Sequence, residues 1–255
     1  MTVEITRRTD HWEFPAESPK AAAAVRAGLA YLGRENFGGV LTIESGLPRG
    51  KGMASSTADV VGAIHAVCAA LGQIISPEEV ARLALGIEPT DGSAFPDIAL
   101  FDHRSGRIYE NLGACPPIDI VVLDFGGEVD TVAFNQCDRS ELLRELEPEA
   151  AEALRLVRRG LTIGDVRAIG RGATLSAKAN QNVLHKPQLD AVIAVADEID
   201  ALGVNVGHSG TVVGVLLHPQ KHHAASVASW VAHRLPSPEA TYTCQIIGGG
   251  FQVAY

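Results

Sequence analysis

The stretch GLPRGKGMASSTADVVGAIHAVCAA, residues 46–70, decides how the rest of the chain is read. Its first half is rich in glycine and proline and predicts a loop. Its second half carries apolar residues at helical spacing and predicts a helix with one buried face from Thr57 to Leu71. A glycine-rich loop entering a helix presents backbone N–H groups at the positive end of the helix dipole. With the hydroxyls of Ser55, Ser56 and Thr57 and the mobile cation of Lys51, the stretch predicts a cradle for nucleotide phosphates.

A simpler interpretation of the same residues stays open. Serine and threonine are preferred N-cap residues for reasons unrelated to any ligand, so residues 55–57 could merely begin a helix after an ordinary loop. The stretch is not a Walker A loop either, because the order G-x-x-x-x-G-K-[ST] is absent and Lys51 precedes the final glycine, Gly52.

Composition narrows the class of protein. The 255 residues are 46% hydrophobic and 20% charged, enough for a sizeable core in one large domain or two small ones. The net charge of -9, with scattered lysines and arginines, argues against nucleic-acid binding. The four cysteines are widely spaced and predict free thiols in a reducing compartment. Since no apolar run approaches about 18 residues, we expect a cytoplasmic protein that does not associate with membranes.

The order of the predicted elements indicates an α+β fold. Strands are expected at 2–7 and 39–45, helices at 18–32 and 76–85, and a β-meander from three strands at 98–102, 107–112 and 118–124. Helices at 140–159, 164–182, 187–202 and 221–234 follow, with a glycine-rich loop and strand within 203–217 and a last strand at 241–247. We therefore predict one domain over residues 1–139 and a second over 140–255, the latter with helices packed on a small antiparallel sheet.

Two acidic residues stand on a proline- and glycine-containing loop after the helix at 76–85. Asp91 could act as a general base or orient an attacking hydroxyl, and Glu88 could help to hold Mg²⁺, because phosphoryl transfer needs positioning and charge neutralisation. The alternative is that Asp91 and Gly92 form a turn and that Glu88 is a solvated acid. Both interpretations stay open.

A second loop of small residues precedes a predicted strand in the second half of the chain. Gly207, His208, Ser209 and Gly210 could approach a phosphate or a substrate closely, or could form a simple turn. Asn180 and Gln181, near a helix end, are expected to be exposed amides, with contact to a small polar substrate as the alternative.

The motif Pro48-x-x-x-Gly52-Met53-Ala54-Ser55-Ser56-Thr57-Ala58 resembles the phosphate loop of the GHMP small-molecule kinases. An N-Q-x-x-L sequence at Asn180 and a late glycine-rich loop occur in the same order as in that superfamily. Within it, the stretches GLPRGKGMASSTAD, IEPTDGSAFPDIALFDHRSG and SAKANQNVLHKP are similar to the L-threonine kinases that serve cobalamin assembly.

The resemblance implies a fold, an activity and a set of site residues. The fold would be an N-terminal domain like domain 2 of ribosomal protein S5 with a ferredoxin-like C-terminal domain. The activity would be transfer of the ATP γ-phosphate to the side-chain hydroxyl of L-threonine, giving O-phospho-L-threonine for the aminopropanol phosphate linker of cobalamin. The expected partners are ATP, Mg²⁺ and a small amino acid, without nucleic acid or membrane, in a monomer or homodimer.

The implied roles follow the matching motif positions. Ser56 and Glu88 would bind Mg²⁺, and Asp91 would face the threonine hydroxyl; Asp91 and Lys51 are the candidate catalytic residues. Asp91 with Gly207, His208, Ser209 and Gly210 would contact the substrate. The residues expected to bind the nucleotide are Pro48, Gly50, Lys51, Gly52, Met53, Ala54, Ser55, Ser56 and Thr57.

One departure from the family pattern bears on activity. GHMP kinases carry an N-terminal P-x-x-x-G-E-L motif on a first hairpin, and this sequence has none, so we expect that hairpin to be missing. The alternatives to a threonine kinase are a kinase for another small alcohol, such as homoserine or mevalonate, a truncated non-catalytic GHMP-fold binding module, and a decarboxylase of the same fold.

Overall fold

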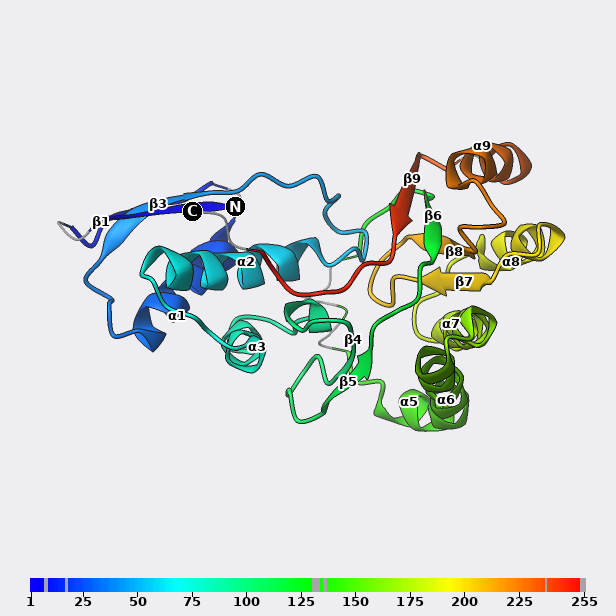
Figure 1. The fold of residues 1–255 in the computed structure, drawn as a ribbon, viewed down its shortest axis with the longest axis horizontal. Helices are drawn as coiled ribbons and strands as arrows, with labels where there is room; N and C mark the ends of the chain where they lie inside the picture. The colour runs from blue at the N-terminus through cyan, green and yellow to red at the C-terminus, as the bar shows by residue number, and fades with distance from the viewer. Residues whose placement is uncertain (7–8, 17, 130–133, 135–136, 237, 253–255) are drawn as a thin grey trace. The chain divides into compact units, whose positions relative to one another are not determined.

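The computed structural model describes residues 1–6, 9–16, 18–129, 134, 137–236 and 238–252. The chain divides into two compact units (Figure 1). Unit 1 comprises Met1–Pro48, Ala54–Asn111 and Gly249–Tyr255, and unit 2 comprises Arg49–Met53 and Leu112–Gly248. The predicted phosphate loop therefore contributes to both units, since its residues 49–53 belong to unit 2 and the chain from Ala54 onward returns to unit 1.

Unit 1 packs three helices against one another and a three-stranded sheet. The sheet has the order β1-β3-β2, with β1 antiparallel and β2 parallel to β3. A separate two-stranded sheet pairs β4 with β5. The elements are β1 (Thr2–Thr6), β2 (Trp12–Glu13), α1 (Pro19–Tyr31), β3 (Gly38–Thr42), α2 (Ser55–Ala70), α3 (Pro77–Leu85), the 3₁₀ turn η1 (Gly92–Ala94), β4 (Ile98–Phe101) and β5 (Tyr109–Gly113).

Small and β-branched residues explain how these helices pack. Val25 of α1, Val60 and Ile64 of α2, and Val80 of α3 are fully buried in one cluster. Gly28 of α1 lies against α2, where a Cβ would stand 3.5 Å from the side chain of Val67. Such close packing makes α2 a rigid support for the residues at its first turn.

Local signals at helix ends agree with the sequence prediction. Ser76 caps α3, its side chain accepting a hydrogen bond from the backbone N–H of Glu79, and Pro77 follows at the first helical position. These residues define the start of α3, and the loop that carries Glu88 and Asp91 follows its last residue, Leu85.

Unit 2 is built on a four-stranded antiparallel sheet of order β7-β8-β6-β9. Helices α7, α8 and α9 lie along this sheet (Figure 1), and apolar residues from the strands and these helices form one buried cluster. The elements are β6 (Asp119–Asp124), α5 (Ser140–Glu145), α6 (Glu147–Ile163), α7 (Val166–Asn180), α8 (Leu189–Glu198), β7 (Gly203–Val206), β8 (Val213–Leu217), α9 (Ala224–Arg234) and β9 (Ala240–Gln245). The predicted α+β class and antiparallel second sheet are confirmed.

Two details differ from the sequence prediction. The β-meander is wrong: β4 and β5 pair with each other, whereas β6 pairs with β8 and β9 in unit 2. The alternating apolar residues of β6 face both a buried cluster under α7–α9 and a second cluster around Ile118. The stretch 203–217 forms two strands rather than a loop and one strand. One division between the compact units falls between Asn111 and Leu112, and the domain boundary at 139 and 140 stays a prediction.

No helix in the described part of the chain has both the length and the apolar character needed to cross a membrane.

Candidate active site

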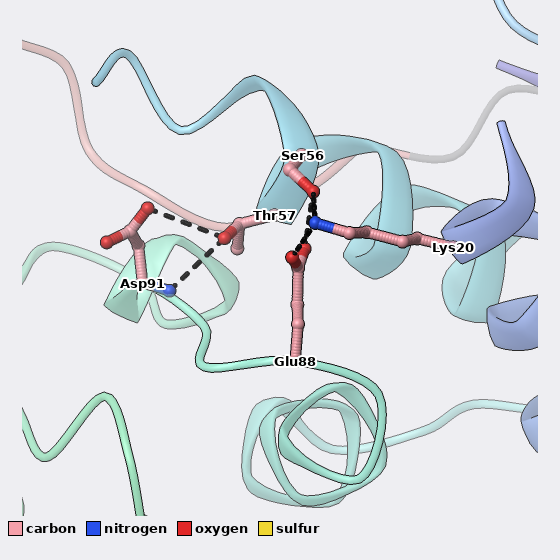
Figure 2. A network of polar contacts seen from close by, with 5 residues as sticks. All are labelled: Lys20, Ser56, Thr57, Glu88 and Asp91. Atoms are coloured by element: carbon pink, nitrogen blue, oxygen red, sulfur yellow. Dashed lines mark hydrogen bonds and ion pairs between the residues drawn. The ribbon is translucent and has the colours of Figure 1, made fainter. Parts of the chain in front are cut away.

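The start of α2 lacks the serine or threonine cap that the simpler interpretation of the sequence requires. The N-cap residue is Ala54, in the left-handed conformation with φ 57° and ψ 23°, and within the described chain no side chain caps this helix end. A non-glycine residue held in this region carries local strain. The hydroxyls of Ser56 and Thr57 instead face the loop that follows α3 (Figure 2). As at any helix start, the N–H groups of the first turn have no acceptor within the helix.

Ser56 and Glu88 lie together, as the metal-site prediction requires. The Ser56 hydroxyl donates to Glu88 Oε1 at 2.5 Å, and the Glu88 side chain is only 10% exposed. A third residue completes the cluster: the Lys20 ammonium, from the first turn of α1, donates to Ser56 Oγ at 3.2 Å and forms an ion pair with Glu88 Oε2 (Figure 2). A hydroxyl and a carboxylate oxygen already hold one cation here.

The donor set fits a magnesium ion that also binds substrate. Mg²⁺ prefers oxygen ligands and is usually held by one or two protein groups, with water and phosphate oxygens completing its shell. The described residues contain no cluster of three or more histidine, cysteine, aspartate or glutamate side chains that could hold a metal alone. A metal at Ser56 and Glu88 would therefore complete its shell with water or with the oxygens of a bound nucleotide.

Thr57 holds Asp91 from the neighbouring position on α2. Its buried hydroxyl lies 3.4 Å from Asp91 Oδ2 and accepts a hydrogen bond from the Asp91 backbone N–H at 3.3 Å (Figure 2). The Asp91 residue itself is exposed. Four predicted site residues are thus brought together in unit 1, with the two carboxylates directed at adjacent hydroxyls of one helix.

In unit 2, Lys51 is held by the end of β6. Its ammonium lies 3.0 Å from Asp124 Oδ2 and donates to the Gly127 carbonyl at 2.8 Å. The hydrogen bond to Asp124 is the main reason that the pKa of Lys51 is raised, and the charges of Glu239 and Glu128 add to the effect. Lys51 is therefore a fixed cation rather than the freely mobile one that the sequence suggested.

The two predicted glycine-rich loops meet within unit 2. Thr211 donates its backbone N–H to the Lys51 carbonyl at 3.1 Å. A Cβ built on Gly210 would stand 2.1 Å from that carbonyl oxygen and 2.3 Å from Gly52 N, and Gly52 has a φ of +81°. Gly207 likewise lies against Gly52. Only glycine at position 210 allows the two backbones this approach.

The remaining predicted residues occupy the margins of these clusters. Gly50 accepts a hydrogen bond from Val129 N–H at 3.2 Å, and Pro48 and Met53 are half-buried at the ends of the segment 49–53. The ring of His208 lies 3.1 Å from Ser176 Oγ, and Ser209 is half-buried. The site roles assigned to all these residues stay predictions.

No sequence motif singles out Lys20 or Asp124, because their partners Glu88 and Lys51 lie 68 and 73 positions away along the chain. Asn180, expected to be exposed, is buried: its Oδ1 accepts from Lys186 Nζ at 3.0 Å and its Nδ2 donates to the His208 carbonyl at 3.4 Å. Burial lowers the pKa of Lys186 to about 8. The motif N-Q-x-x-L was the one sequence signal for this cluster.

Comparison with known proteins gives the family. The model described as GHMP kinases N terminal domain matches residues 19–103, and the model described as GHMP kinases C terminal matches residues 140–234. The chain belongs to the GHMP kinases and is an ATP-dependent phosphotransferase that acts on an alcohol.

Individual relatives are similar over most of their length. The chain is 30% identical over 230 residues to the L-threonine kinase of Salmonella typhimurium, covering 90% of this chain and 71% of that protein. It is 31% identical over 218 residues to that of Citrobacter freundii, covering 86% and 70%. A homoserine kinase from Cytophaga hutchinsonii shares the fold with a TM-score of 0.71 at 16% identity, covering 97% of this chain and 85% of its own. A mevalonate kinase does so with a TM-score of 0.68 at 14% identity, covering 98% and 89%.

Proposed function

We propose that this GHMP kinase transfers the γ-phosphate of ATP to the side-chain hydroxyl of L-threonine, and that the O-phospho-L-threonine formed serves the aminopropanol phosphate linker of cobalamin. The observation that carries the proposal is the similarity to two L-threonine kinases over 90% and 86% of the chain. The homoserine and mevalonate kinases are similar in fold alone.

The proposed phosphate contacts come from the start of α2 and from the loop before it. Ser55, Ser56 and the backbone N–H groups of the first helical turn would bind phosphate oxygens at the positive end of the helix dipole. Lys51, paired with Asp124 within unit 2, is the further proposed cation of the phosphate loop. Mg²⁺, held by Ser56 and Glu88, would neutralise negative charge on the transferring phosphoryl group.

Asp91 is the proposed partner of the acceptor hydroxyl. In the reaction, the threonine oxygen attacks the γ-phosphorus while its proton passes to the Asp91 carboxylate, and the bond from that phosphorus to the β-γ bridging oxygen breaks to release ADP. The contact with Thr57 restricts the carboxylate, so that little reorganisation is needed once the acceptor is bound.

The test is ADP release with ATP and Mg²⁺ against L-threonine, L-serine, L-homoserine, mevalonate and no acceptor, with the product identified by phosphorus NMR. We expect kcat/KM for L-threonine to exceed that for each other acceptor at least tenfold. A preference for L-homoserine or mevalonate would identify a kinase for another alcohol. If the folded protein still binds an ATP analogue but releases no ADP with any acceptor, the result would favour a non-catalytic binding module.

Two substitutions examine the residue roles. Asp91→Ala is expected to abolish turnover while binding of a non-hydrolysable ATP analogue changes little, and unchanged turnover would remove Asp91 from the reaction. Glu88→Gln is expected to raise the Mg²⁺ concentration needed for half-maximal activity. A Mg²⁺ response identical to that of the unaltered chain would refute the metal assignment.

A further inference from the structure

The ammonium group of Lys20 occupies the place that the proposed function gives to a metal ion. It contacts Ser56 Oγ at 3.2 Å and pairs with Glu88 Oε2, while the same serine donates to the other oxygen of that carboxylate (Figure 2). All three residues belong to unit 1. The oxygen atoms that would bind Mg²⁺ are therefore already engaged by a cation of the chain itself.

Two cations cannot share this small set of ligands. Mg²⁺ requires its oxygen ligands at about 2.0–2.1 Å, which leaves no room for an ammonium on the same carboxylate oxygen and hydroxyl. At such separations two positive charges repel each other strongly even under partial screening. One of the two must leave when the other binds.

Lys20 is the group able to leave. Its side chain is 38% exposed, whereas that of Glu88 is 10% exposed and Ser56 is fixed in the first turn of α2. A lysine side chain has four flexible carbons and is solvated readily, so its ammonium can move into water while its backbone stays in α1.

We propose that Lys20 is an exchangeable cation of the Ser56–Glu88 site, which neutralises Glu88 until a divalent metal displaces it. The proposal rests on the proposed metal site. It explains why a nearly buried carboxylate can exist beside a helix start without metal, since an unpaired buried charge would destabilise the fold. Because the displaced ammonium remains tethered beside the metal, it stays within reach of any phosphate that the metal binds.

The test is a Mn²⁺ titration of the nucleotide-free full chain, followed by electron paramagnetic resonance. Lys20→Met removes the competing charge, and we expect it to lower the Kd for Mn²⁺ about tenfold, equivalent to about 1.4 kcal/mol. Lys20→Arg keeps a competing cation and should stay within about twofold of the unaltered chain. Lys178→Met, which removes an exposed lysine of unit 2, is the matched control and should have no effect.

A double variant tests whether the tighter Mn²⁺ binding occurs at Glu88. In the double variant Lys20→Met with Glu88→Gln, the tighter binding should disappear. The proposal is overturned if Lys20→Met binds Mn²⁺ equally or more weakly, if the gain persists in the double variant, or if no variant binds Mn²⁺. None of these outcomes tests the proposed kinase reaction, which is measured separately as threonine-dependent ADP release.

Discussion

Gly210 offers the sharpest test of how unit 2 holds Lys51. In Gly210→Ala the new methyl group would meet the Lys51 carbonyl oxygen at 2.1 Å and Gly52 Cα at 2.3 Å. These are backbone atoms, which cannot move aside by changing rotamer. The two loops must therefore separate by about 1 Å to reach ordinary van der Waals contact.

This separation sets the size of the effect. It lengthens the 3.1 Å hydrogen bond from Thr211 N–H to the Lys51 carbonyl beyond the usual range. Overpacking costs about 1–3 kcal/mol, and one lost backbone hydrogen bond costs about 0.5–1.5 kcal/mol. We expect a total loss of about 2–4 kcal/mol, which for a chain of this size lowers the Tm by about 5–15 °C. Displacement of Lys51 should also lower kcat/KM at least tenfold where the variant is still folded.

The assay is thermal unfolding by calorimetry, together with ADP release at a temperature well below both transitions. Gly46→Ala is the matched control, because a Cβ there meets nothing within 4 Å and the backbone has no positive φ. That control should shift stability by less than about 0.5 kcal/mol. If Gly210→Ala melts and turns over like Gly46→Ala, the close approach of the two loops is not as described.

Three further predictions concern buried polar groups. Thr57→Val removes the contacts to Asp91, of 3.3 and 3.4 Å, and should lower kcat about fivefold with ATP-analogue binding unchanged, as steady-state kinetics and calorimetric titration would reveal. Burial lowers the pKa of His65 to about 4, so the unfolded chain binds a proton more readily than the folded one. The free energy of unfolding should therefore fall by up to about 3 kcal/mol as the pH is lowered from 6.5 to 4. Urea unfolding of His65→Leu should lack that loss. The pKa of Lys186 is lowered to about 8, so between pH 8 and 10.5 the folded state binds fewer protons than the unfolded state. The free energy of unfolding, measured relative to that of Lys186→Met, should therefore rise with pH over this range. A difference between the two chains that does not change with pH would contradict the prediction.

Much of the local structure could be predicted because its causes are local. The apolar spacing from Val60 to Cys68 places one face of α2 in the core, and the predicted helix matches the observed one within two residues at its start. The Ser76–Pro77 pair begins α3 as expected. The family, too, was accessible from sequence, because the phosphate-loop motif is long and contiguous.

The contacts that complete the candidate site could not be predicted, because they join distant parts of the chain. Lys20 and Glu88 are separated by 68 positions and Lys51 and Asp124 by 73, and neither pair has a spacing rule of its own. The same limit explains β6: its apolar alternation predicts a strand, but its partners β8 and β9 come about a hundred residues later.

The sequence by itself determined the helices, most strands, the antiparallel second sheet and the GHMP kinase family, since these depend on periodicity and on short motifs. Only the tertiary structure decided which charges meet. In the structure, Lys51 is held by Asp124 instead of being mobile, and Asn180 is buried. The Lys20 ammonium contacts the oxygens that are predicted to hold a metal. The physical reason is that hydrogen bonds and ion pairs act over about 3 Å, and only folding brings such residues to that distance.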